Sequence, residues 1–249
     1  SDMVVEVGDI VAVEASPGHD IGIVSMEGEI VRFQLRKKKI DPRSPEIKKV
    51  YRKARLTDIE KWVTAVEAET STMYKAREIA MRLNLLMKIN DVEYQGDNTK
   101  AVFYYTAEDR VDFRELIKIL AEEFKVRIEM RQIGARQEAS RLGGIGSCGR
   151  ELCCATWMND FHSVTTNSAR VQQLSMNPQK LAGQCGKLKC CLNYEFETYQ
   201  DAIKSFPDVE VVLKTRKGDA IHQKTDIFRR MMWYTYVNDP SNFMAISVD

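Results

Sequence analysis

Apolar and polar residues alternate along the first part of the chain with a period of two, which is typical of β-strands. Turn residues such as glycine, proline and aspartate separate the alternating runs, as they do in antiparallel hairpins. The predicted strands are Met3–Val7, Ile10–Glu14, Ile21–Ser25 and Ile30–Leu35. Residues 1–56 are therefore predicted to form a small antiparallel β-sheet or barrel.

The pattern changes to helical spacing at residue 57. Thr57 and Glu60 have the spacing of a capping box, and apolar residues then recur every three or four positions to about Leu85. The segment that follows predicts the strands Val92–Gln95 and Ala101–Thr106, the helix Phe113–Phe124 and the strand Val126–Ile133. Such a unit packs its helix against its sheet, so residues 57–142 are predicted to form a compact α+β layer.

The rest of the chain divides into a cysteine-rich part and a closing set of strands. Residues 143–206 contain the cysteines and end in a predicted aromatic-rich helix, Leu192–Phe206, before Pro207. The strands predicted after it are Val209–Thr215, Ile221–Gln223 and Met231–Val237. The sequence as a whole predicts an α+β protein in four parts, which are residues 1–56, 57–142, 143–206 and a C-terminal β extension, 207–249.

Composition narrows the class of protein. The chain has 249 residues, of which 44% are hydrophobic, enough to bury a core without disulfides. No apolar run approaches the roughly 18 residues of a membrane span. No charged-then-apolar leader opens the chain, so we expect a cytoplasmic protein. No Ser/His/Asp set or paired-carboxylate motif stands out, so the residues indicate no catalytic site of a familiar type.

The cysteines carry the strongest signal in the sequence. All six lie between residues 148 and 191, in two copies of the pattern C-G-K/R-x-x-C-C, and the second copy starts 37 residues after the first. The candidate metal ligands are Cys148, Cys153, Cys154, Cys185, Cys190 and Cys191. Two copies of one pattern that together use every cysteine indicate a shared chemical role.

A thiolate-bound metal or cluster requires several soft sulfur ligands held together by tight turns. The glycine after the first cysteine of each copy lets the backbone bend around such a centre. Arg150, Lys187 and Lys189 are expected to offset thiolate charge and to lower the cysteine pKa values. The spacing differs from the C-x2-C of common zinc sites and matches plant-type ferredoxins in part. The three interpretations, in order, are an iron–sulfur or other metal centre, buried inert thiols, and disulfides.

A basic stretch lies between residues 32 and 55, which hold 11 basic and 2 acidic residues, a local net charge of +9 in a chain whose total is +1. The candidates for contact with nucleic acid or a partner are Arg36, Lys37, Lys38, Lys39, Lys48, Lys49, Arg52, Lys53 and Arg55. Such a stretch is typical of a surface that binds phosphate groups, and equally of a solvated loop and strand face.

Several segments of the chain match a known family. They are Gly8–Glu14, Val111–Leu116, Arg127–Gly134, Gly143–Cys154 and Gly183–Glu195. In this order they closely resemble the bacterial RicT (YaaT) proteins, whose shared region is named for the C-terminal domain of a yeast polymerase-suppressor protein. The resemblance covers about residues 8–206.

The resemblance implies a regulatory protein and not an enzyme. RicT-like proteins act in the cytoplasm with two small helical subunits, in a complex that carries [4Fe–4S] clusters and directs the endoribonuclease RNase Y in mRNA maturation and turnover. That complex also influences sporulation, competence and biofilm formation. The matching cluster ligands are drawn from the six cysteines of this chain. The alternatives are a zinc-stabilised module that binds nucleic acid through residues 32–55, and a thiol redox sensor that uses the adjacent cysteine pairs.

Overall fold

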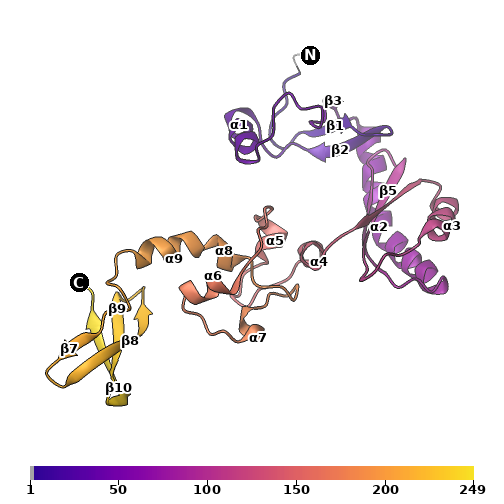
Figure 1. Cartoon of the computed structure of the whole chain (residues 1–249). Coiled ribbons are helices and arrows are strands. Elements are labelled where there is room, and N and C mark those ends of the chain that lie inside the picture. Colours follow the sequence, from indigo (N-terminus) through magenta and orange to yellow (C-terminus); the bar gives the residue numbers. More distant parts are fainter. Residues whose placement is uncertain (1–2) are drawn as a thin grey trace. The chain divides into compact units, whose positions relative to one another are not determined.

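The computed structural model describes residues 3–249, which divide into two compact units (Figure 1). The first unit ends at Gly134 and the second begins at Ala135. Both units combine helices with β-sheets, so the predicted α+β class is confirmed. The finer division into four parts stays a prediction.

The first unit begins with a three-stranded antiparallel sheet. Its strands are β1 (Ile10–Glu14), β2 (His19–Ile23) and β3 (Val50–Lys53), in the order β2-β1-β3. The predicted strand Met3–Val7 is wrong, because this segment pairs with no strand in the described part of the chain. Strand β3 was not predicted, because its side chains are mostly exposed and show no alternation of apolar and polar residues.

The predicted strand Ile30–Leu35 is also wrong, because this segment forms helix α1 (Gly28–Lys37). The short run fits both periods: its apolar residues alternate with polar ones, yet Ile30 and Phe33 lie one helical turn apart. Charge favours the helix, since Glu29 lies in its first turn and two basic residues lie in its last, where each sign complements the helix dipole.

An α+β layer completes the first unit. It consists of α2 (Leu56–Arg82), β4 (Lys88–Tyr94), β5 (Lys100–Thr106), α3 (Arg114–Phe124) and β6 (Arg127–Gln132). Strand β5 lies between β4, which is antiparallel to it, and β6, which is parallel to it. Ile79 of α2, Phe103 of β5 and Leu116 of α3 are fully buried in one core. The predicted strand–strand–helix–strand layer is confirmed.

Helix α2 begins two residues earlier than a cap at Thr57 predicts, because its N-cap is Arg55. Asp58 is its third residue, and the Asp58 carboxylate accepts a hydrogen bond from the backbone N–H of Arg55 at 2.8 Å. Arg52 of β3 binds the same carboxylate. The predicted capping box of Thr57 and Glu60 is therefore wrong, because the N-cap is Arg55 and Thr57 already lies within the first turn of the helix.

The N-terminal sheet is joined to the layer at the turn between β4 and β5. The Asp97 carboxylate accepts a hydrogen bond from the backbone N–H of His19 at 3.0 Å, and the Gly96 N–H donates to the Asp20 carboxylate at 2.8 Å. Gly96 has no room for a side chain, since a Cβ there would lie 2.7 Å from the backbone nitrogen of Ile21. The turn between β4 and β5 thus depends on close approach of two backbones.

The second unit begins with short helices around the cysteine motifs. They are α4 (Ala135–Leu142), α5 (Cys153–Thr156), α6 (Thr166–Val171), α7 (Pro178–Leu181), α8 (Cys191–Tyr194) and α9 (Phe196–Ile203). The predicted helix Leu192–Phe206 is present but divided at Glu195. Helix α4 was not predicted, because it buries none of its residues and has little apolar periodicity. No helix within residues 3–249 is both long enough and apolar enough to cross a membrane.

A four-stranded antiparallel sheet closes the second unit (yellow in Figure 1). Its strands are β7 (Leu213–Thr215), β8 (Gly218–Asp226), β9 (Met231–Tyr236) and β10 (Asp239–Ser247), in the order β10-β9-β8-β7. The three predicted strands are confirmed with shifted bounds. Strand β10 was missed because its first residues, Asp239 to Asn242, have the composition of a turn, and the register shifts between Asp239 and Phe243.

Candidate metal centre

Each cysteine motif folds into a tight turn, and the two turns have the same backbone hydrogen bonds. We name residues 144–154 the first knuckle and residues 181–191 the second knuckle. The bonds in the first knuckle run from Gly146 N to Arg150 O at 2.7 Å, Gly149 N to Gly146 O at 2.9 Å and Leu152 N to Gly144 O at 3.0 Å. Their counterparts run from Gly183 N to Lys187 O at 2.8 Å, Gly186 N to Gly183 O at 3.0 Å and Lys189 N to Leu181 O at 3.0 Å. The sequence repeat is therefore a repeat of structure.

The glycine after the first cysteine of each knuckle has a left-handed backbone, with φ of 78° at Gly149 and 73° at Gly186. Other residues adopt this conformation only with strain, which explains the glycine of the pattern. A second glycine stands two positions before the first cysteine. A Cβ added there would lie 3.4 Å from the cysteine Sγ in the first knuckle and 3.7 Å in the second.

All six cysteines line one cavity of about 330 Å³ within the second unit. Both knuckles contribute to its wall, together with Arg136 of α4, Glu195 and Tyr199. Cys148 is exposed, and the other five cysteines are half-buried. The structure therefore brings every predicted metal ligand to a common space, although the two motifs are separate in sequence.

Burial raises the pKa of the Cys153, Cys154 and Cys191 thiols, and neighbouring cysteines raise it further. Arg136 lowers the pKa of Cys154, and Lys189 lowers that of Cys191, but loss of solvent outweighs both cations. The expected lowering of cysteine pKa values by basic residues is therefore wrong for these three thiols. Metal binding at these thiols has to displace a proton.

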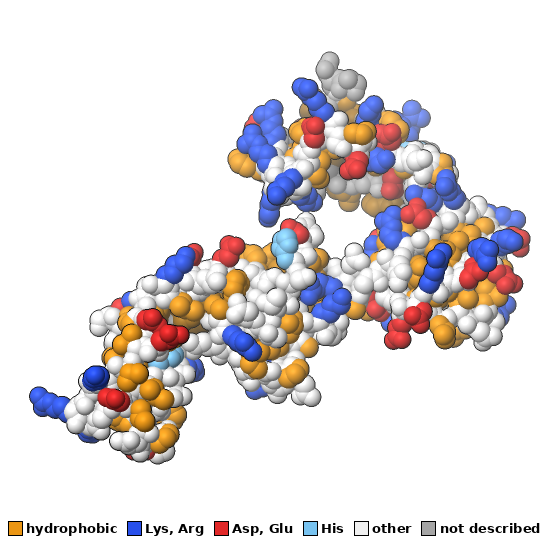
Figure 2. Space-filling model, in the orientation of Figure 1, with side chains coloured by type: hydrophobic (Ala, Val, Ile, Leu, Met, Phe, Trp, Pro, Cys, Tyr) orange, Lys and Arg blue, Asp and Glu red, His pale blue; other side chains and the backbone are white. Residues whose placement is uncertain are grey.

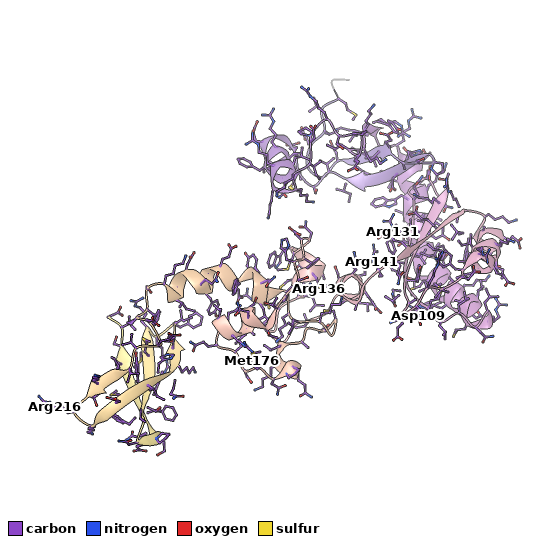
Figure 3. The ribbon with its side chains drawn as sticks, viewed as in Figure 1. Asp109, Arg131, Arg136, Arg141, Met176 and Arg216 are labelled. Carbon is purple, nitrogen blue, oxygen red and sulfur yellow. The ribbon has the colours of Figure 1, made fainter. Side chains whose placement is uncertain are left out.

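Two side chains that the sequence analysis missed hold the knuckles in place. Gln184 of the second knuckle donates its Nε2 to the backbone oxygen of Ile145 in the first. Gly144 leaves space for this contact, because a Cβ there would lie 2.9 Å from the Gln184 Oε1. Arg136, labelled in Figure 3, donates its Nη2 to the backbone oxygen of Leu188 at 3.0 Å. Neither residue belongs to the repeated pattern: Gln184 directly precedes its second copy, where the first copy has Ser147, and Arg136 lies in α4.

The donor set fits a thiolate-bound centre. Six free thiols share one cavity, and Glu195 adds a carboxylate to its wall. Within residues 3–249, no three His, Cys, Asp or Glu side chains are already spaced as metal ligands. Thiolates select iron–sulfur clusters, zinc and copper(I), so the chemistry of the donors suits both a cluster and zinc. Which four thiols bind stays a prediction.

The basic candidates belong to the first unit, and the residues of the cysteine cavity belong to the second. Arg52 is paired with Asp58, and Lys53 is paired with Asp9 at 2.7 Å, so these two cations stabilise the fold. The remaining candidates are exposed, and they are Arg36, Lys37, Lys38, Lys39, Lys48, Lys49 and Arg55.

Three family descriptions match the chain. The PSP1 C-terminal conserved region matches residues 48–133, and the third domain of PSP1-like proteins matches residues 163–206. The YaaT C-terminal domain matches residues 214–249. The second match contains the whole second knuckle, and the third contains all of the closing sheet except Leu213, a part of the chain that the sequence resemblance did not reach.

The chain is also similar to curated proteins. It is 49% identical over 152 residues to Stage 0 sporulation protein YaaT of Bacillus subtilis, which covers 61% of this chain and 55% of that protein. It is 31% identical over 93 residues to an uncharacterized protein of Schizosaccharomyces pombe, covering 37% of this chain and 12% of that one. It is 50% identical over 44 residues to Protein PSP1 of Saccharomyces cerevisiae, covering 18% and 5%. The chain thus spans about half of the bacterial relative and much less of the yeast proteins. No solved structure matches it.

Proposed function

The chain belongs to the YaaT/PSP1 family, and we propose that it is a regulatory adaptor whose knuckles hold an iron–sulfur centre. The adaptor is not an enzyme. It acts in the cytoplasm, with small helical subunits and an endoribonuclease such as RNase Y, in the processing and turnover of mRNA, as the resemblance to RicT proteins implies. The name of the Bacillus subtilis relative, Stage 0 sporulation protein YaaT, supports a link to sporulation.

One observation carries the proposal: two structurally equivalent knuckles present all six cysteines of the chain to one cavity. Inert thiols have no need of a repeated turn with a left-handed glycine in each copy. The bond between Gln184 and Ile145 ties one knuckle to the other, as a shared centre requires. If the two knuckles share one centre, the positions of α5 and α8 would depend on whether a metal or cluster is bound there, because both helices begin at the last residues of the knuckles.

Four of the six thiols would hold a cluster, and the equivalent positions of the knuckles favour Cys148, Cys153, Cys185 and Cys190. When bound, a cluster supplies a redox-active and oxygen-sensitive link between the two knuckles. The chain itself supplies the cavity, the turns that position the cysteine sulfurs and the hydrogen bond from Gln184 to Ile145 that joins the two knuckles. Such a regulatory protein senses iron supply or oxygen, because residues 143–195 are ordered when the cluster is bound and become disordered when it is lost.

Zinc is the alternative occupant of the knuckles, because it also binds thiolates. Acid-labile sulfide separates the two, since only a cluster contains it. A thiol redox sensor is less well supported. Sensor thiols are typically exposed and have a low pKa, whereas burial raises the pKa of Cys153, Cys154 and Cys191.

A Bacillus subtilis strain that lacks YaaT provides the test of this function. Expression of the wild-type chain should restore spore formation. The double variant Cys148→Ser, Cys185→Ser should not restore it, although immunoblots should show equal protein levels. The matched control is His162→Ala, because the His162 side chain is 79% exposed and its ion pair is with Asp160, which is equally exposed. Full spore counts from the cysteine variant would show that the regulatory function does not need the knuckles.

A further inference from the structure

Helix α1 (Gly28–Lys37) buries none of its residues. Its outward side carries two large apolar side chains one turn apart, Ile30 with 58% and Phe33 with 67% of its surface exposed. Arg36 and Lys37 follow Phe33 by three and four positions, so the aromatic ring and two cations share one side of the helix. An amphipathic helix that covers no core is available to bind another molecule.

A dense group of cations without acidic partners continues from α1. Among the basic residues of the segment 32–55, Arg32, Arg52 and Lys53 form ion pairs. Within the described part of the chain no ion pair involves the others, which are Arg36, Lys37, Lys38, Lys39, Arg43, Lys48, Lys49 and Arg55. All of these are exposed, and Figure 2 shows Lys and Arg side chains crowded over α1.

Helix stability does not account for this group of cations. Basic residues in the last turn of a helix complement its dipole, but the effect falls off beyond that turn. Arg36 and Lys37 fill this position. Lys38 caps the helix and Lys39 already has a left-handed backbone, with φ of 54°. Like charges that lie close together repel one another, so this surface is suited to an anionic ligand that neutralises them.

We propose that the exposed cations of α1 and of residues 38–49, together with the exposed rings of Phe33 and Tyr51, bind single-stranded RNA directly. The proposal rests on the proposed function for the choice of RNA over DNA. Phosphates match the unpaired cations, and the exposed rings of Phe33 and Tyr51, the latter 53% exposed, offer faces on which unpaired bases stack. A duplex hides the faces of its bases, so the aromatic residues favour a single strand over a duplex.

Fluorescence anisotropy with a short labelled RNA and the full chain measures this binding between about 50 and 200 mM salt. Changing Lys37, Lys38 and Lys39 together to Gln should weaken binding and reduce the slope of log K against log salt by up to about 2, because each lost phosphate contact removes roughly 0.7. Phe33→Ala should weaken binding roughly 5- to 150-fold and leave the slope unchanged, because stacking involves no counterion release.

Matched controls come from the second unit. Lys214, Arg216 and Lys217 are exposed cations around the turn between β7 and β8, and changing all three to Gln alters the net charge by the same amount. Phe228 is 84% exposed, so Phe228→Ala removes an aromatic surface of the same kind. Both controls should bind RNA as the wild-type chain does. Equal losses in the controls and in the test variants would overturn the proposal.

Other outcomes also decide against the proposal. Absence of RNA binding at low salt would overturn it, and so would tighter binding to a duplex or to single-stranded DNA of the same sequence. Binding to phosphatidylglycerol vesicles without binding to RNA would assign the surface to membranes and overturn it as well. Metal content is measured on the same preparations. A folded, iron-loaded chain that binds no RNA refutes this inference alone, and a chain that binds RNA but takes up no metal refutes the metal centre instead.

Discussion

Replacing Gly186 by alanine tests whether the second knuckle is the tight turn that positions its cysteines. The backbone of Gly186 has φ of 73°, and a Cβ added there meets no atom within 4 Å. The cost of the change is therefore backbone strain alone, about 1–2 kcal/mol for an L-residue in the left-handed region. We expect the knuckle to open roughly 5- to 30-fold more often.

Amide hydrogen exchange measures this opening at the N–H groups that close the turn. Gly183, Gly186 and Lys189 donate those hydrogen bonds in the second knuckle, and their exchange should accelerate by the stated factor. Gly149→Ala should have the same effect in the first knuckle, because the two turns have equivalent bonds and a similar φ.

Two further variants make the Gly186 result decisive. Gly186→Asn should retain most of the protection, because asparagine tolerates the left-handed region better than alanine. Gly134→Ala is the control, since this glycine has an ordinary φ and a Cβ there meets no atom within 4 Å. Unchanged exchange in Gly186→Ala, or an equal loss of protection in Gly186→Asn, would refute the strain argument.

Three other predictions follow from contacts elsewhere in the two units. Gln184→Ala should cost about 0.5–1.5 kcal/mol and speed the labelling of cysteines in both knuckles, as measured with a thiol reagent. Gly96→Ala should lower the free energy of unfolding of the first unit by about 1–3 kcal/mol in denaturant titrations, whereas Gly22→Ala, with no atom within 4 Å of the added Cβ, should be nearly neutral. Burial alone would raise the pKa of Asp97, but hydrogen bonds from the His19 and Thr99 backbones and from the Thr99 and Gln95 side chains hold it below its usual value. The pKa of Asp97 in the unfolded chain is about 4, so its contribution to stability should be fully present above this pH. The contribution should be lost as the pH falls through the lower pKa of the folded state. Thermal melts of Asp97→Asn at several pH values should lack this part of the acid dependence.

The layer of the first unit could be predicted from sequence because its signals agree with one another. Helices α2 and α3 and strands β4 to β6 are long enough for their apolar period to be clear, and turn residues separate them. Helix α1 was mispredicted because its run of apolar residues is short and fits both periods. It also buries nothing, so no core fixed the pattern of its side chains.

The cysteines of the candidate site were predictable because the pattern occurs twice and uses every cysteine. The contacts that join the knuckles were not. The bond from Gln184 to Ile145 and that from Arg136 to Leu188 depend on where separate segments meet, which local sequence does not encode. The direction of the thiol pKa shifts was mispredicted for the same reason, since the degree of burial is a property of the folded unit.

The central claim is that both knuckles serve one metal centre, and the metal and sulfide content of anaerobically purified protein tests it most directly. We predict about four iron and four acid-labile sulfide per wild-type chain, as a single [4Fe–4S] cluster contains. We also predict that Cys148→Ser alone and Cys185→Ser alone each remove most of the iron, because neither knuckle suffices. Zinc without sulfide would contradict the cluster, and half of the metal retained by each single variant would contradict the shared centre.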